Sequence, residues 1–352
     1  MSAKINLLFY VVCLSILICA CGEKSCYRHE VREVNFLTDN MPTVKGEEIE
    51  LDAMGCDDII IYDSLIIVLT NNPAHHIQVF SLNSYKQLAN IGPTGRARNE
   101  FVYDRPQNRS KQVYEKDGHI IMPVVDYSIL KEIDITASIE QQQTVMISAE
   151  NCLSIQDGNF VLLDNSVDKK FEYRVGEPDE VNLKVDFGRF FVNNSEGEKE
   201  IKVYSKIMEG EGDERYRSMV CHGVLTKHPM KNIVAQKLSY LEYILMFDFD
   251  KNKYYALHQQ NTRTFDEGTP GSVTTHYVTS VPSNNYLMIL KRIKNEKFDS
   301  VIIVIDWQGN CICSYKLDKH INRMAYDERN NILYGMDYTV DKIYKFNLNG
   351  IL

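Results

Sequence analysis

The chain has 352 residues, with 39 lysine and arginine residues against 48 aspartate and glutamate residues, so its formal net charge is −9. Apolar residues make up 44% and charged residues 25% of the sequence, a balance typical of a folded protein rather than a disordered one. An acidic chain without a block of basic residues argues against nucleic acid as a partner, because phosphate backbones are bound by clustered lysine and arginine.

The first residues have the order of a secretory signal. Lys4 supplies a positive charge, and the apolar stretch over residues 5–19 is too short for a comfortable membrane span of about 20 residues. The ending Ile18-Cys19-Ala20-Cys21 resembles a bacterial lipobox, which implies cleavage before Cys21 and diacylation of its thiol. We therefore expect a signal peptide at 1–20 and a lipid anchor in the outer membrane, with the periplasmic face and the cell surface both open. An ordinary secretory signal or an uncleaved anchor helix is the alternative.

A repeated strand-and-turn unit dominates the rest of the chain. We expect a lipidated tether over residues 21–45 and one domain over residues 46–352, made of short β-strands without a helix longer than about two turns. In each unit an apolar residue is followed by two variable residues, an apolar residue, a polar turn-former and another apolar residue. Copies begin at Ile77, Leu130, Ile244, Ile302 and Ile343. Their spacing predicts six units of about 53 residues, with a degenerate copy over about 171–187.

This pattern predicts an all-β six-bladed β-propeller. Several strands are apolar at consecutive positions, which is typical of four-stranded sheets that are covered on both faces by their neighbours. A β-sandwich is the alternative, but it does not explain the period. The last unit shows only three strands before the chain ends. We expect an N-terminal strand, either Glu47–Leu51 or Val31–Phe36, to complete that blade and so remove its exposed edge.

Two motifs carry a resemblance to a known family. The segment from Ile91 to Phe101, IGPTGRARNEF, resembles the turn that ends the first blade in TolB-like six-bladed propeller lipoproteins of Bacteroidetes. The segment from Val304 to Asn310, VIDWQGN, resembles their penultimate blade, and the ordered motifs span roughly residues 50–350. The sequence departs from the family pattern at Ala97 and Arg98, where glycine and proline are usual. The resemblance implies the fold, but it brings no established reaction and no catalytic residues.

The loop after the first blade contains the candidate ligand-binding residues. In this acidic chain, clustered arginines predict an anion-binding patch, because guanidinium groups pair bidentately with carboxylate or phosphate. The candidates are Arg96, Arg98, Glu100, Arg105 and Arg109. The alternative is a solvated loop in which the arginines pair with Glu100 and Asp104.

No sequence pattern indicates a cofactor or a metal. The segment that begins at Asp248 has the oxygen spacing of a calcium loop, but Lys253 and Gln259 stand where glycine and glutamate are needed. A hairpin turn explains it better. The chain also lacks zinc-type histidine pairs, a nucleophile elbow and a phosphate-binding loop. Most of the cysteines that follow Cys21 are expected to be buried thiols rather than a disulfide framework.

These observations favour a non-catalytic binding or scaffolding protein. Its partners would be the membrane, through the lipid anchor, and a peptide, a glycan or an envelope protein held at the rim or at an axial mouth. The alternative is a metal-dependent hydrolase or lactonase-like enzyme with an axial site assembled from several blades. An axis lined by carboxylates and amides would favour the enzyme, whereas an apolar or cationic axis would favour binding.

Overall fold

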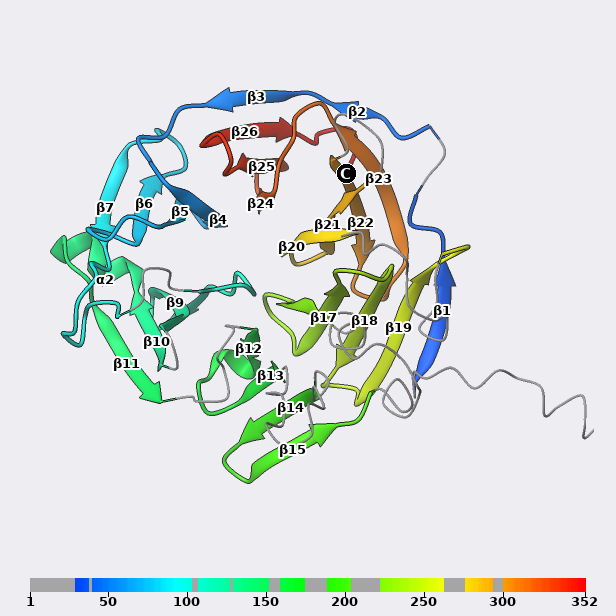
Figure 1. The fold of residues 1–352 in the computed structure, drawn as a ribbon, viewed down its shortest axis with the longest axis horizontal. Helices are drawn as coiled ribbons and strands as arrows, with labels where there is room; N and C mark the ends of the chain where they lie inside the picture. Colours follow the sequence, from blue (N-terminus) through cyan, green and yellow to red (C-terminus); the bar gives the residue numbers. More distant parts are fainter. Residues whose placement is uncertain are drawn as a thin grey trace, which may run out of the picture.

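Six small sheets stand in a ring around a central axis (Figure 1). The structure is a computed structural model, and it describes residues 29–37, 40–102, 107–126, 129–151, 159–174, 189–203, 222–262, 276–293 and 300–352. In each sheet the main strands are antiparallel neighbours in chain order, and the first of them lies nearest the axis. The chain is therefore a six-bladed β-propeller, as its sequence predicts.

The blades are numbered along the chain. Blade 1 contains β4 (Cys56–Tyr62), β5 (Leu65–Thr70), β6 (Ile77–Ser81) and β7 (Gln87–Ile91), and blade 2 contains β8 (Tyr114–Lys116), β9 (His119–Asp126), β10 (Ile129–Asp134) and β11 (Met146–Asn151). Blade 3 contains β12 (Phe160–Leu162), β13 (Lys170–Arg174), β14 (Arg189–Asn194) and β15 (Gly197–Ile201), and blade 4 contains β16 (Gly223–Lys227), β17 (Ile233–Leu238), β18 (Tyr243–Asp248) and β19 (Lys253–Gln259). Blade 5 contains β20 (Tyr277–Pro282), β21 (Tyr286–Arg292), β22 (Ser300–Asp306) and β23 (Cys311–Leu317), and blade 6 contains β24 (Arg323–Asp327), β25 (Ile332–Asp337), β26 (Lys342–Asn347) and β3 (Gly46–Ile49).

The apolar core lies between the blades rather than at the axis. Six clusters of buried side chains fill the six junctions between neighbouring blades, and every residue of β5 and β18 is buried. Central strands are covered on both faces, so their sequences are nearly continuous apolar runs instead of alternating ones. Because the apolar side chains face the neighbouring blades, the axis is left to polar groups.

An N-terminal strand closes the ring. Strand β3 pairs antiparallel with β26, with Ile49 opposite Ile343 and Gly46 opposite Phe346. A Cβ atom on Gly46 would lie 2.5 Å from the Phe346 ring, so the close approach of ring and backbone requires glycine here. The expectation that an N-terminal strand completes the last blade is confirmed, and of the two predicted segments the one near Glu47 provides it.

Two further strands attach the N-terminal segment to the outside of the ring. Strand β1 (Glu30–Val34) pairs in parallel with β19, and β2 (Thr43–Val44) pairs in parallel with β23. Between them Phe36 is fully buried in the junction of blades 4 and 5. We call residues 29–37 and 40–49 the N-terminal belt, because they follow the rim from blade 4 to blade 6 (Figure 1). Most of the belt falls within the range that we expected to be a tether.

The structure corrects the position of the degenerate repeat. The other five copies lie in the third strand of their blades, and the third strand of blade 3 is β14. The degenerate copy is therefore Arg189–Asn194, beyond the expected range of 171–187, which includes β13 instead. The second copy also ends differently from a hairpin. Its Asp134 carboxylate caps α2 (Ile135–Gln141) by accepting from the Ala137 backbone N at 2.8 Å.

The expected signal peptide at 1–20 and the expected lipid-bearing Cys21 lie outside the described residues. Among the residues that are described, no helix combines the length and the apolar composition that crossing a bilayer requires.

Removal of residues 22–52 should lower the melting temperature sharply, compared with that of the soluble chain (residues 27–352). This deletion removes β3 and leaves β26 as an open edge, and each buried residue lost with the belt contributes about 1.5–3 kcal/mol to stability. Thermal unfolding followed by circular dichroism measures the effect. The matched control removes only residues 22–41, which keeps β2 and β3 and should cost less. Equal melting temperatures for the full soluble chain and the longer deletion would contradict the role of β3.

Candidate functional site

The arginine-containing loop between β7 and β8 begins with a compact turn. The Glu100 carboxylate accepts a hydrogen bond from the Ala97 backbone N at 2.8 Å, and the Gly95 N donates to the Phe101 carbonyl oxygen at 2.8 Å. A Cβ atom on Gly95 would lie 1.8 Å from a carboxylate oxygen of Glu100. The side chain of Glu100 is therefore used to hold the loop together, which is a structural role.

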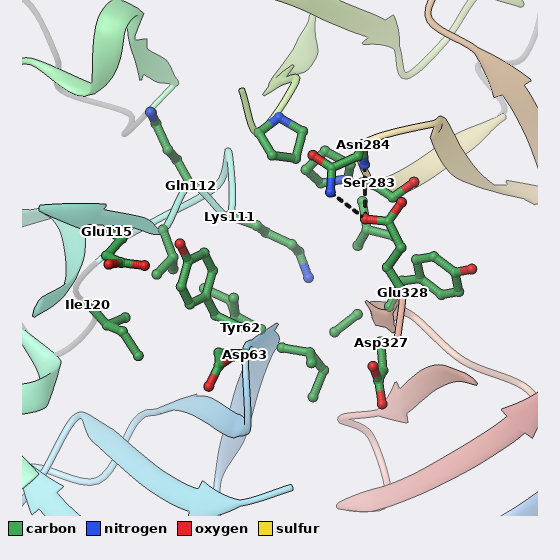
Figure 2. A pocket seen from close by; sticks show the side chains of 18 of the residues that line it. Tyr62, Asp63, Lys111, Gln112, Glu115, Ile120, Ser283, Asn284, Asp327 and Glu328 are labelled. Carbon is green, nitrogen blue, oxygen red and sulfur yellow. Dashed lines mark hydrogen bonds between the residues drawn. The ribbon is translucent and has the colours of Figure 1, made fainter. Parts of the chain in front are cut away.

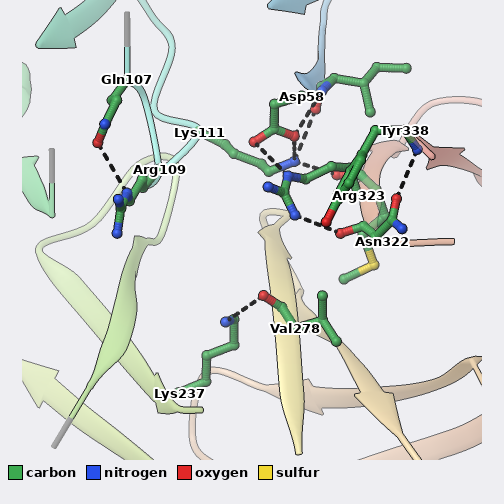
Figure 3. A network of polar contacts seen from close by, with 11 residues as sticks. Asp58, Gln107, Arg109, Lys111, Lys237, Val278, Asn322, Arg323 and Tyr338 are labelled. Atoms are coloured by element: carbon green, nitrogen blue, oxygen red, sulfur yellow. Dashed lines mark hydrogen bonds and ion pairs between the residues drawn. The ribbon is translucent and has the colours of Figure 1, made fainter. Parts of the chain in front are cut away.

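The structure separates the candidate arginines. Arg96 and Arg98 are exposed, and Arg98 lies against the outermost strand of blade 2, with its guanidinium 3.5 Å from the Ile147 carbonyl oxygen. Arg109 is half-buried on the axial side, where its Nε donates to the Gln107 side-chain oxygen at 3.1 Å (Figure 3). Arg105 lies outside the described residues. The described candidates thus fall on two sides of blade 2 rather than in one patch.

A central cavity of about 740 Å³ lies at one end of the ring (Figure 2). It is lined by the turns that follow the innermost strands of blades 1, 4, 5 and 6, together with residues 111–120 of blade 2. This volume is within the range of about 300–1,000 Å³ that is usual for ligand pockets. Because five blades contribute, no short stretch of the sequence could show this site.

Lys111 reaches into the floor of the cavity and joins three blades. Its ammonium pairs with the Asp58 carboxylate and donates to the carbonyl oxygens of Ile59 at 3.1 Å and Met324 at 2.9 Å. Burial lowers the pKa of Lys111, and Asp58 opposes this shift. The residue has a positive φ of 55°, an uncommon conformation for lysine that the turn imposes. All three ammonium donors have partners, so Lys111 connects blade 2 with blades 1 and 6.

Lys227 lines the wall of the cavity without an ion pair. It is 5% exposed, and its ammonium contacts the His228 carbonyl oxygen at 3.2 Å and the Asn165 side-chain oxygen at 3.4 Å. Within the described part of the chain, no carboxylate lies within ion-pair distance of it. Burial lowers the pKa of Lys227 to about 8, although Asp164 and Asp250 oppose the shift from farther away. At neutral pH it is a cation with spare donor capacity.

His228 provides a second unused donor beside it. The Met230 backbone N donates to its Nδ1 at 3.0 Å, and the centre of its ring lies 5.0 Å from that of Trp307, with the two rings tilted by 42°. Burial, with help from nearby lysines, lowers the pKa of His228 to about 4, while the Asn284 backbone opposes the shift. The ring is therefore neutral at pH 7. Since Nδ1 accepts, the proton is on Nε2, which is buried; the Asn284 backbone lies nearby, but the described residues offer Nε2 no hydrogen bond of normal geometry.

The acidic groups at the cavity mouth are already engaged. Asp63 forms an ion pair with Arg329. Glu328 accepts hydrogen bonds from the backbone N of Asn284 at 3.1 Å and from its side-chain Nδ2 at 2.8 Å (Figure 2). These contacts join turns of different blades, so the carboxylates shape the mouth. On the blade 4 side of the cavity, the groups that face a ligand are the donors of Lys227 and His228; Glu115, on the blade 2 side, also lines the cavity and forms no ion pair among the described residues.

Other sequence candidates have structural explanations. Asp248 accepts from the backbone N of Lys251 at 3.0 Å in a hairpin turn, as expected. Cys56, Cys311 and Cys313 are free thiols, and burial raises the pKa of Cys313 to about 11. In the residues that the structure describes, no three histidine, cysteine, aspartate or glutamate side chains gather into a group that could hold a metal ion.

Comparisons with known proteins show the fold. Neither protein-family models nor curated proteins match the chain. A crystal structure from Bacteroides fragilis, provisionally described as an exported protein, is similar with a TM-score of 0.53 and 10% identity, over 90% of this chain and 98% of that one. The Raptor structure from Chaetomium thermophilum is similar with a TM-score of 0.51 and 12% identity, over 87% of this chain and 29% of that one. At these identities the likeness concerns architecture alone. Propellers commonly serve as binding or scaffolding domains.

The ion pair between Asp58 and Lys111 should be important for stability. Replacement of Asp58 by asparagine leaves a buried ammonium without its counter-charge, which typically costs about 3–5 kcal/mol. Chemical denaturation measures the loss, and the neighbouring Asp57→Asn variant, which breaks no observed contact, should change stability by less than about 0.5 kcal/mol.

A double-mutant cycle provides the second test of this pair. Adding Lys111→Met to Asp58→Asn should recover part of the loss, because the uncompensated charge is then removed. Simple additivity of the two single losses would show that the residues are not energetically coupled.

Proposed function

We propose that this protein is a lipid-anchored, non-catalytic binding propeller of the bacterial outer membrane that holds the end of a peptide or a glycan in its central cavity. The resemblance to TolB-like propeller lipoproteins, the lipobox ending at Cys21 and the exported structural neighbour support the envelope location. The observation that carries the binding role is the cavity itself. Its wall presents the buried Nε2 of His228, for which the described residues provide no hydrogen bond, beside the Lys227 ammonium, which has two oxygen contacts but no carboxylate partner among them.

The chemistry of these donors indicates what the ligand contributes. A cationic ammonium and a neutral imidazole N–H both require an oxygen acceptor, and a carboxylate satisfies both best. Buried donors without a partner cost free energy, and a bound acceptor would remove that cost. A peptide C-terminus or an acidic sugar has such a group. The cavity volume suits the end of a chain rather than a whole folded partner, for which the rim around Arg96 and Arg98 remains available.

The charge at the axis argues against the metal-dependent hydrolase. Lys111, Lys237 and Arg323 gather there (Figure 3), and cations repel a divalent metal ion. A cationic axis is the arrangement that we expected to favour binding.

Binding should depend on both cavity donors. We expect short peptides with a free C-terminus, or acidic oligosaccharides, to bind in isothermal titration calorimetry, and C-terminal amides or neutral sugars to bind more weakly. Lys227→Met and His228→Phe keep the side-chain volume and should each weaken binding about tenfold or more, since a hydrogen bond to a charged group is worth about 1.5–3 kcal/mol. The control is Lys231→Met, which changes an exposed neighbour.

An unchanged affinity in both cavity variants would contradict this proposal. If binding were lost instead on substitution of Arg96 and Arg98, the ligand site would be the rim.

Metal ions should leave the stability of the protein unchanged. A ligand that binds only the native state raises its stability by mass action, so a specific ion would shift the melting temperature of the soluble chain (residues 27–352). We expect the same melting temperature with calcium, magnesium or zinc at about 1 mM as with a chelator. A rise specific to one ion, reversed by the chelator, would support the hydrolase instead.

A further inference from the structure

Four cationic side chains, Lys111 among them, lie around the axis (Figure 3). Arg323 begins the innermost strand of blade 6, and Arg109 comes from the loop that precedes blade 2. Lys237 lies on β17, and its ammonium donates to the carbonyl oxygen of Val278 in blade 5 at 3.1 Å. We call Arg109, Lys111, Lys237 and Arg323 the axial cation cluster. Blades 2, 4 and 6 thus place cationic side chains near the axis, with Lys111 and Arg323 close enough to Lys237 to repel its ammonium.

The negative charge in the cluster is much smaller than the positive charge. Asp58 is its one carboxylate among the described residues, and it is shared by Lys111 and by Arg323, whose Nε lies 3.8 Å from Oδ2. Neither Lys237 nor Arg109 forms an ion pair within the described part of the chain. The cluster therefore contains four basic side chains and one carboxylate.

Lys237 is the most costly member of the cluster. It is 1% exposed, and among the residues that the structure describes one carbonyl oxygen is the only partner for its three ammonium donors. Burial lowers the pKa of Lys237 to about 7, and repulsion from Arg323 and Lys111 adds to this shift. An apolar side chain of the same size would avoid that cost, because a buried ammonium without a counter-charge destabilises a fold. A lysine here is better explained by a bound anion than by packing.

Arg323 is held ready for such an anion. Its guanidinium lies 5.1 Å from the centre of the Tyr338 ring and donates to the Asn322 carbonyl oxygen at 3.0 Å. The Asn322 side chain in turn accepts from the Tyr338 backbone N at 2.9 Å. Arg323 is 29% exposed, so the cluster is open to solvent on one side. An arginine fixed by an aromatic ring and a carbonyl group is pre-organised for bidentate contact with an oxyanion.

We propose that the axial cation cluster is a binding site for a tetrahedral oxyanion with two negative charges, such as a phosphate or sulfate group. Donors that come from blades 2, 4 and 6 suit an anion with oxygens on several sides. A dianion also offsets most of the excess positive charge. This proposal goes beyond the proposed function. The residues that would bind the anion do not include Lys227 or His228, so the two proposals can fail separately.

Sulfate is the probe for the test, because it stays doubly charged between pH 6 and pH 9. We expect titration calorimetry on the soluble chain to detect sulfate binding above a sodium chloride background of equal ionic strength. Lys237→Met should weaken sulfate binding at least tenfold while keeping or raising the melting temperature, since it removes a buried charge. Arg323→Lys, which keeps the charge but loses bidentate geometry, should weaken binding less. Lys86→Met, on the exposed outer hairpin of blade 1, is the control and should bind like the unaltered chain.

The pH dependence provides a readout that a purely structural lysine would not give. The charged groups that act on Lys237 are Arg323 and Lys111, and both repel its ammonium. Because the pKa of Lys237 is lowered, its ammonium is charged at pH 6 and largely neutral at pH 9. Sulfate should therefore bind several-fold more tightly at pH 6, and Lys237→Met should abolish the difference. Equal sulfate affinity in Lys237→Met and the unaltered chain, or no binding above chloride, would overturn the proposal.

Glycerol phosphate distinguishes a free ion from an esterified group. Tighter binding of the ester than of inorganic phosphate would indicate a site for the phosphorylated end of a larger ligand. The opposite order would indicate a site for the free ion.

Discussion

Burial of every blade between two neighbours is the constraint on which this structure depends. A single four-stranded sheet with both faces apolar has no stable exposed form, so each of the six interblade clusters requires the next blade to be in place. The ring must therefore close, and the pairing of β3 with β26 closes it by joining distant parts of the chain in one sheet. Closure also removes the open edge that a linear stack of sheets would present.

The same constraint explains why polar chemistry concentrates at the axis. Once the apolar side chains are used between blades, the narrow centre is left to residues such as Lys111 and Lys237. The two lysines are similarly buried, but they differ in their hydrogen-bond acceptors among the described residues. Lys111 has a carboxylate and two carbonyl oxygens, whereas Lys237 has one carbonyl oxygen. If Lys237 had only a structural role, we would expect its ammonium to have as many hydrogen-bond acceptors as that of Lys111. The contrast separates a structural cation from one that is available to a ligand.

The architecture could be predicted from the sequence because its strand pattern repeats. The candidate site could not, because its residues follow no repeated pattern. Apolar spacing predicts strands, and the missing strand of the last blade predicts closure by the N-terminus. The predicted position of the degenerate repeat was wrong, because the aromatic residues of β13 resemble the third strand of a blade. The density of arginines in one loop predicts a single patch, but the structure places Arg98 at the rim and Arg109 at the axis. Asp58, Lys237 and Arg323 come together only through the ring, so no local pattern marks them.

With the proposed lipid anchor at Cys21, the N-terminal belt would also limit how the propeller is oriented on a membrane. Only about nine residues separate the expected lipid-bearing Cys21 from Glu30, so a fully extended leader spans about 30 Å. A lipid at that position would keep the rim of blade 4, where β1 pairs with β19, close to the bilayer, and the propeller could pivot but not drift away. Tension on the anchor would load the parallel pairing of β1 and β19 along the strand direction, so its hydrogen bonds would resist together rather than one after another. The belt would then act as a mechanical clamp that keeps force on the anchor from reaching β3.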